Sequence, residues 1–235
     1  MSLPKNYKIV DLALQYKDTL IIGDLQLGFE TYLHKKGVLV PIFQLDDILE
    51  RLKSIFQKTT VKKIVINGDV KHEFGTISNQ EWRDVLKLFD FLLQHVDEII
   101  LVKGNHDLAL APIAQKRNIQ IVDFYQIDDV TILHGHKIIP SLSKTLIIGH
   151  EHPAISFPER RGEKYKCFLV GTWKKHDLIV LPSFNPLTEG SDVLQGHFLS
   201  PFLKGGIEKF EVYVVGEQKP LYFGKVKDLR KLKSE

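Results

Sequence analysis

The sequence predicts an α/β fold in which short apolar strands alternate with amphipathic helices. Short apolar runs rich in β-branched residues recur along the chain, and the segments between them have helical apolar spacing. No Gly/Ser-rich or Pro-rich linker divides the sequence, and it contains no internal repeat. With 235 residues, 43% of them hydrophobic, the chain is long enough to fill a core. We therefore expect a single domain over residues 1–235.

The strand candidates are five short apolar runs, each followed within three residues by Asp, Asn or His. In open α/β sheets, ligand sites lie beyond the carboxyl ends of the strands, so these polar residues are expected to gather. One polar residue after a strand is ordinarily a turn former, whereas five in succession indicate one shared site. The runs cover residues 20–23, 64–66, 97–102, 130–133 and 146–148.

Two segments between these runs, residues 43–56 and 79–95, have the apolar spacing of amphipathic helices. The only cysteine, Cys167, excludes an intramolecular disulfide and is expected to be a buried core residue. Residues 182–199 contain two prolines and two glycines and are expected to form a long loop. Such a loop could cover a cleft or form a dimer contact, and the sequence does not choose between these roles.

Composition and charge limit the function classes. The amino terminus lacks the apolar core of a signal peptide, and no apolar run approaches the roughly 20 residues that span a bilayer. We expect a soluble cytoplasmic protein without a membrane partner. The net charge is +3, with much of the basic excess in residues 158–166 and 225–233. Such runs are usually solvated faces, and attraction to a phosphate backbone is the alternative.

The polar residues at the strand ends form a mixed set of metal donors. Carboxylate, amide and imidazole groups together suit Mn²⁺, Fe²⁺ or Zn²⁺, and Mg²⁺ is also compatible with the oxygen donors. The set is too large for one ion, which predicts two divalent ions, most simply Mn²⁺, sharing a carboxylate about 3.5–4 Å apart. Such a pair binds a phosphate oxygen and lowers the pKa of a bound water. The candidate ligands are Asp24, Gln26, Asp69, Asn105, His134, His150 and His152.

Five motifs along the chain carry a family resemblance. The segments GDLQLG, NGDVKHEFG, KGNHD, LHGH and GHEH resemble, in this order, the motifs of calcineurin-like metallophosphoesterases. The longer phrases GDVKHEFG, GHEHPA and LPSFNPL are similar to the small archaeal phosphoesterases related to the SbcD-type repair nuclease. The resemblance implies a hydrolase of phosphoric ester bonds. It also implies a four-layer αββα sandwich, with two mixed β-sheets flanked by helices and later strands at residues 166–170, 178–181 and 211–215.

The resemblance also implies a role for each motif residue. Asp69 would bridge the two ions. His106 would contact the scissile phosphate and assist the leaving group, Asp107 would orient His106, and Asn105 would also face the substrate. The first ion would be held by Asp24, Gln26, Asp69 and His152, and the second by Asp69, Asn105, His134 and His150.

Three residues depart from the family pattern or extend it. Gln26 occupies a position that is usually histidine, so it either donates a weaker amide oxygen or lies outside the metal shell. We expect the first site to bind metal more weakly and to favour Mn²⁺ or Mg²⁺ over Zn²⁺. His136 points the same way as His134 on an extended strand end and is expected near the substrate. His72, just past Asp69, would line the substrate cleft or bond to local backbone.

Three functions fit this site. The leading hypothesis is a phosphodiesterase, in particular a nuclease-like hydrolase acting on nucleic acid. The second is a small-nucleotide phosphodiesterase or phosphomonoesterase with the same metal core and a narrower pocket. The third is a metal-stabilised, non-catalytic binding module that docks on a DNA-processing partner.

Overall fold

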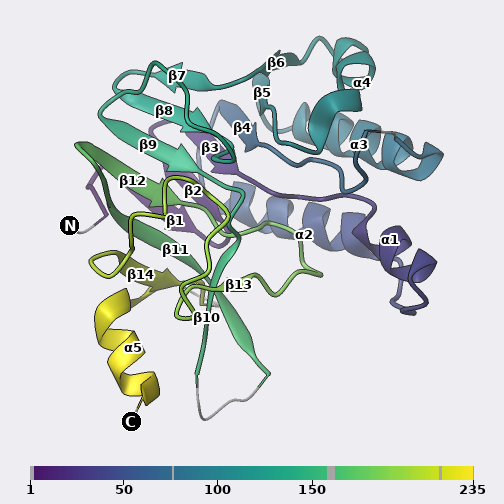
Figure 1. The fold of residues 1–235 in the computed structure, drawn as a ribbon. Helices are drawn as coiled ribbons and strands as arrows, with labels where there is room; N and C mark the ends of the chain where they lie inside the picture. The colour runs from purple at the N-terminus through teal and green to yellow at the C-terminus, as the bar shows by residue number, and fades with distance from the viewer. Residues whose placement is uncertain (1–2, 76, 158–161, 217–218, 235) are drawn as a thin grey trace.

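The computed structural model describes residues 3–75, 77–157, 162–216 and 219–234, and it consists of two mixed β-sheets packed face to face (Figure 1). The basic stretch predicted at residues 158–166 lies partly outside the described residues. No helix in the described ranges is both long enough and apolar enough to cross a membrane.

The first sheet contains the first three of the predicted strand ends. Its amino-terminal part is an antiparallel meander, and from β3 onward neighbouring strands are parallel, so β3, β4 and β5 end at the same edge. The order is β1 (Tyr7–Val10), β2 (Ala13–Tyr16), β3 (Thr19–Ile22), β4 (Lys63–Asn67), β5 (Glu98–Val102) and β6 (Gln120–Val122).

The second sheet contains the remaining two predicted strand ends, on the parallel neighbours β8 and β9. β9 also pairs in parallel with β12, whereas β7 and β11 are antiparallel to their neighbours. The strands are β7 (Tyr125–Ile127), β8 (Val130–Leu133), β9 (Thr145–Ile148), β12 (His176–Val180), β11 (Lys164–Trp173), β10 (Pro153–Ser156) and β13 (Ser191–Asp192) in spatial order, with β14 (Glu211–Val214) pairing β11 and β15 (Leu221–Lys225).

Helices cover the outer face of the first sheet (Figure 1). α2 (Gln44–Gln57) and α3 (Asn79–Leu92) each bury one apolar stripe against this sheet. α3 begins at a capping box, in which Ser78 and Glu81 each accept a hydrogen bond from the other's backbone amide. The remaining helices are α1 (Phe29–Lys35), α4 (Ala111–Gln115), α5 (Val226–Ser234) and the single 3₁₀ turn Asp107–Ala109.

Strand alternation produces three apolar layers. On β4, Ile64 and Ile66 face the helices, whereas Val65 faces the second sheet. Between the sheets, Val65 belongs to the same buried cluster as Ile147 and Phe168. The outer face of the second sheet is covered by the segment that contains Phe202, Leu203 and Ile207 and by α5, through Val226 and Leu229.

The αββα architecture is therefore confirmed, with the fourth layer made of irregular chain and one helix. The five predicted strand runs correspond to β3, β4, β5, β8 and β9, and the later ones to β11, β12 and β14. The predicted helix over residues 43–56 begins one residue later, and the one over 79–95 ends at Leu92. Residues 182–199 form the expected loop apart from the two-residue strand β13.

Candidate metal centre

The loops after β3 and β4 run side by side and place two aspartates at the shared edge of the sheets. The backbone amide of Asp24 donates to the carbonyl of Gly68 (3.1 Å), and the amide of Gln26 donates to the carbonyl of Asp69 (2.8 Å). Both aspartate side chains are buried, which withdraws two carboxylates from water. Such burial is costly unless each charge is compensated, so their partners define the site.

Each aspartate uses one carboxylate oxygen to fix another loop. Asp24 Oδ2 accepts the backbone N–H of His150 (3.0 Å), and Asp69 Oδ1 accepts the backbone N–H of His106 (3.0 Å). The other oxygens face imidazoles. Asp24 Oδ1 lies 3.2 Å from His152 Nε2, and Asp69 Oδ2 lies 3.4 Å from His134 Nε2. Asp24 Oδ1 is buried and makes no hydrogen bond within the described residues, as expected of an atom reserved for a metal.

His134 is the point where the donor atoms converge. Its Nε2 lies 3.1 Å from Asn105 Oδ1 and 3.2 Å from His150 Nδ1, in addition to its contact with Asp69. One donor atom each from Asp69, His134 and His150 lies within 4.8 Å of the others. These three residues belong to the predicted second ion site, whereas Asp24 and His152 belong to the first.

The charges of this cluster are strongly coupled. Burial disfavours the charged form of His134, but its hydrogen bond with Asp69 and the charges of Asp24 and Asp69 outweigh burial and raise the pKa of His134 to about 9. Burial would raise the pKa of Asp69, yet the contacts with His134 and the His106 amide lower this pKa to about 2. Burial and the charge on His134 lower the pKa of His150 to about 4. Without metal, a proton on His134 thus neutralises part of the carboxylate charge.

Five of the seven candidate ligands have left-handed backbone conformations, which non-glycine residues seldom adopt. Each costs on the order of 1–3 kcal/mol and persists only where the surrounding structure enforces it, which is typical of functional sites. The residues are Asp24 (φ 56°), Gln26 (φ 48°), Asp69 (φ 46°), His150 (φ 67°) and His152 (φ 50°).

Two glycines allow the loops to approach the carboxylates closely. A Cβ atom on Gly104 would lie 2.1 Å from Asp69 Oδ1 and 2.3 Å from the Asp69 amide nitrogen. A Cβ atom on Gly149 would lie 2.6 Å from Asp24 Oδ2. Any side chain at these positions would displace the carboxylates, so the sequence places glycine where the site closes.

The residues present fit divalent metal ions. The buried Oδ1 atom of Asp24, which makes no hydrogen bond within the described residues, and the convergence of oxygen and nitrogen donors are features of a site for a divalent cation. Gln26 is also buried, and its backbone carbonyl accepts a hydrogen bond from Gln44 Nε2 (2.8 Å). Within the described residues, the side-chain amide of Gln26 makes no hydrogen bond. The proposed role of Gln26 as a metal ligand stays a prediction.

The predicted substrate residues lie around this cluster. His106 Nδ1 is 2.5 Å from the backbone carbonyl of His72, and His106 Nε2 is 3.8 Å from Asp69 Oδ2. The Asp107 carboxylate accepts the backbone N–H groups of Val70 and Gly104, both at 2.9 Å. The His72 carbonyl thus contacts the His106 ring and the Asp107 carboxylate joins two motif loops, and the orientation of His106 by Asp107 stays a prediction. Burial and the charge of Asp69 raise the pKa of Asp107 to about 6.

His136 and His72, the two histidines predicted to lie near the substrate, have different surroundings. The ring centroid of His136 lies 5.4 Å from that of His134 and 6.1 Å from that of His150, so it borders the candidate metal ligands. His72 packs against Phe29 and Tyr32 of α1, at ring-centroid distances of 4.7 and 4.6 Å. Each has a buried Nδ1 atom without a hydrogen bond in the described ranges.

Sequence reasoning missed the support behind Asp24. Ser183 Oγ donates to the Asp24 carbonyl (2.8 Å), and the Asn185 amide donates to the same oxygen (3.3 Å). The partly buried ammonium of Lys166 in turn donates to the backbone carbonyls of Ser183 (2.9 Å) and Asn185. The phrase LPSFNPL was available as a signal, but only the structure shows that it contacts Asp24.

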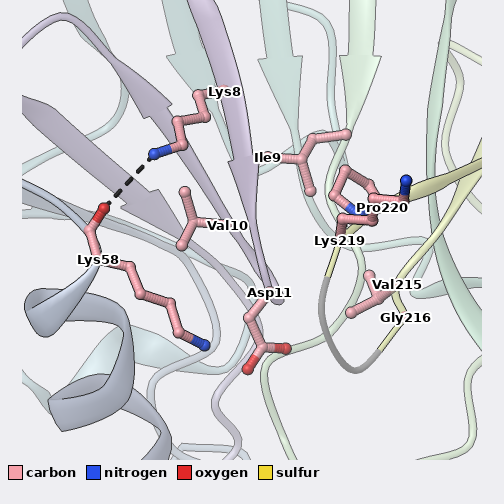
Figure 2. Close-up of a pocket in the computed structure, with 9 residues that line it drawn as sticks. All are labelled: Lys8, Ile9, Val10, Asp11, Lys58, Val215, Gly216, Lys219 and Pro220. Atoms are coloured by element: carbon pink, nitrogen blue, oxygen red, sulfur yellow. Dashed lines mark hydrogen bonds between the residues drawn. The ribbon is translucent and has the colours of Figure 1, made fainter.

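A recess outside the candidate metal centre lies between β1 and the chain around β14 and β15 (Figure 2). Its volume is about 300 Å³, and three lysines border it; Lys8 Nζ donates to the Lys58 carbonyl at 3.4 Å. None of the candidate metal ligands lines it, so it is separate from the candidate centre. The lining residues are Lys8, Ile9, Val10, Asp11, Lys58, Val215, Gly216, Lys219 and Pro220.

Comparisons with known proteins identify a family and similar folds. The family model described as calcineurin-like phosphoesterase matches residues 18–214. The solved structure of Pseudomonas putida nuclease MPE has a TM-score of 0.63 and 17% sequence identity, covering 93% of this chain and 100% of that one. YfcE, a phosphoesterase from E. coli, has a TM-score of 0.42 and 16% identity, covering 88% and 98% of the two chains. The search of curated proteins found no match.

Replacing Gly104 by Ala tests the close approach to Asp69. The added methyl group has no space beside the Asp69 carboxylate and amide, so we expect Mn²⁺ affinity to fall by about tenfold or more, the scale on which disturbed ligand orientation weakens metal sites. Isothermal titration calorimetry of metal-stripped protein measures the change. Gly205→Ala is the matched control, because its Cβ meets nothing within 4 Å. Equal affinity in the two variants would contradict the close-approach argument.

The raised pKa of His134 predicts a pH-dependent contribution to the free energy of unfolding of metal-free protein. Its pKa is about 9 in the folded state and 6.5 ordinarily, so its stabilisation is complete below pH 6.5 and lost as the pH rises through 9. Burial lowers the pKa of Lys166 from 10.5 to about 7. The contribution of Lys166 to the free energy of unfolding therefore rises with pH above about 7 and opposes that of His134. The test is therefore the difference between wild type and His134→Gln.

Urea unfolding in the presence of a chelator measures the difference in free energy of unfolding between wild type and His134→Gln. Measurements at about pH 6.5, 7.5 and 9 cover the range between the ordinary and the raised pKa of His134. The destabilisation caused by His134→Gln is expected to shrink as the pH rises, because the charged imidazole that it removes is present only at the lower pH. A destabilisation that stays constant over this range would show that the neighbouring carboxylates do not keep His134 in its protonated form.

Proposed function

The chain belongs to the calcineurin-like phosphoesterase family, whose members are hydrolases of phosphoric ester bonds, and we propose that it is a phosphodiesterase with a dinuclear metal centre. The observation that carries this proposal is the convergence of Asp69, His134 and His150 beside a second carboxylate–imidazole pair, Asp24 and His152. Two adjacent donor groups are what a two-ion clamp on a phosphate needs.

The donors divide naturally between two ions. Asp69 lies between His134 and His106 and is the proposed shared ligand. Asp24, Asp69 and His152, with Gln26, would hold the first ion, and Asp69, Asn105, His134 and His150 the second; we propose Mn²⁺ for both. Bound divalent ions would neutralise charge on the phosphate and lower the pKa of a nearby water.

His106 is the residue proposed to move a proton. The carbonyl of His72 can only accept a hydrogen bond, so Nδ1 of His106 carries hydrogen and Nε2 is the atom that gives or takes the catalytic proton. Asp69 Oδ2 lies 3.8 Å from Nε2, so this atom faces the proposed shared ligand. A proton given to the leaving oxygen avoids release of a strongly basic alkoxide.

A phosphodiester is favoured over a phosphomonoester by the space beside His106. A recess of about 530 Å³ adjoins this residue and can accept a second ester group. The similarity to archaeal SbcD-related phosphoesterases, noted for the motif phrases, also supports a role in nucleic-acid processing. At 17% identity, the likeness to the Pseudomonas putida nuclease supports the fold and does not set the substrate.

The central test is hydrolysis of bis(p-nitrophenyl) phosphate by metal-stripped protein supplied with Mn²⁺. Wild type should turn over only with metal, and Asp69→Asn should lose about 1000-fold in rate, since a divalent ion contributes several kcal/mol of charge stabilisation. Asp46→Asn, at an exposed position on α2, is the matched control and should retain wild-type turnover. A folded wild type that is inactive with every divalent ion would instead favour the metal-stabilised binding module.

The neutral Gln26 amide predicts two unequal metal sites. Imidazole is the stronger donor for Zn²⁺, so Gln26→His should tighten the weaker Zn²⁺ site by about tenfold. Metal titration by calorimetry measures both sites, and Gln57→His, which adds an exposed histidine at the end of α2, is the control. Two equally tight sites in wild type, unchanged in Gln26→His, would remove Gln26 from the proposed metal shell.

A further inference from the structure

The recess beside His106 is lined mostly by aromatic rings, and we call it the aromatic recess. Its lining side chains come from α1, from the loop after β4 and from the loop after β5. Tyr32, His72 and Phe74 place flat ring surfaces next to His106, the residue proposed to protonate the leaving group. The lining residues are Tyr32, His72, Glu73, Phe74 and His106.

The rings of the aromatic recess lie at stacking distances from one another. The centroid of Phe74 is 3.8 Å from that of His106, and the centroid of His72 is 5.8 Å from His106 with an angle of 27° between the planes. Tyr32 and Phe29 hold the His72 ring in place from α1. Burial and the nearby His106 lower the pKa of His72, which favours its neutral ring.

Phe74 is the residue without a structural explanation. Its side chain is 62% exposed, although the residue before it is held in place. Directly before it, the amide of Glu73 donates to the buried carboxylate of Glu81, at 3.1 Å. A single exposed phenylalanine is ordinary on a protein surface. One that lines a recess and touches the ring of a proposed catalytic residue is placed to contact a substrate.

Charged groups border the aromatic rings. Lys35 forms an ion pair with Glu73, and the ammonium of Lys36 lies 5.7 Å from the centroid of the Tyr32 ring. Aromatic faces for bases combined with lysines for the backbone phosphates are the usual elements of single-strand nucleic-acid binding sites. A simple alkyl or sugar ester would use neither feature.

We propose that the aromatic recess binds the nucleobase of the leaving nucleoside, stacked on Phe74, so that the substrate is an unpaired nucleotide chain. This inference rests on the proposed phosphodiesterase activity, because it assigns the leaving side of the ester to the side of His106. A base inside a duplex is already stacked and paired, and it would have to leave the helix to reach the recess. Single strands and dinucleotides meet no such cost.

The kinetic test uses the dinucleotide d(ApA) and two analogues, each lacking the base of one nucleoside. Wild type should cleave the analogue that lacks the leaving-side base about 5–150-fold less efficiently in kcat/KM, which corresponds to the 1–3 kcal/mol of base–aromatic stacking. Phe74→Ala should lose most of this preference, and Phe74→Trp should keep it. The control Tyr222→Ala, at an exposed aromatic residue of β15, should behave as wild type. A preference that survives in Phe74→Ala overturns the proposal.

A binding test separates this proposal from the catalytic one. In metal-stripped Phe74→Trp, deoxyadenosine monophosphate should quench the new tryptophan fluorescence, whereas deoxyribose 5-phosphate should not. Tyr222→Trp should respond to neither. Quenching without any phosphodiester turnover would retain the base site and reject the proposed function. Turnover of bis(p-nitrophenyl) phosphate with no quenching by the nucleotide would do the reverse.

Discussion

Two buried aspartates divide their oxygens between the fold and the site, and the arrangement of the surrounding loops depends on this division. Asp24 binds the His150 amide, and Asp69 binds the His106 amide, each with one oxygen. The second oxygens remain directed at imidazoles. Because Asp24 follows a strand of the first sheet and His150 a strand of the second, the bond between them joins the sheets at the site itself.

This arrangement is energetically demanding, and the rest of the fold stabilises it. Buried carboxylates and left-handed residues each oppose folding by a few kcal/mol. They follow strands such as β3 and β9, whose every residue is buried. Tightly packed strands on both sides hold the loops in place, because a loop could relax only by disturbing close-packed apolar layers. In the metal-free state, the proton on His134 supplies part of the missing charge balance.

The sequence predicted the α/β class and the polar strand ends from local signals, and it predicted the two-sheet sandwich through the family resemblance. An apolar run followed by Asp, Asn or His can be recognised directly in the sequence. Parallel pairing then brings the ends of these strands to one edge of the sheet. The support of Asp24 by Ser183 and the bond from the Val70 amide to Asp107 were not predictable, since they join segments far apart in the chain. The aromatic recess was hidden for the same reason: Tyr32 and Phe74 are unremarkable in sequence and meet only after α1 folds over the loop that follows β4.

The division of donors between the two sheets explains why the sandwich as a whole makes the site. The candidate oxygen ligands Asp24, Asp69 and Asn105 follow β3, β4 and β5 of the first sheet. The nitrogen ligands His134 and His150 follow β8 and β9 of the second. Neither sheet alone offers the mixed donor set that borderline metals require. The apolar layer between the sheets therefore has a chemical role, because it sets the distance at which carboxylates and imidazoles meet.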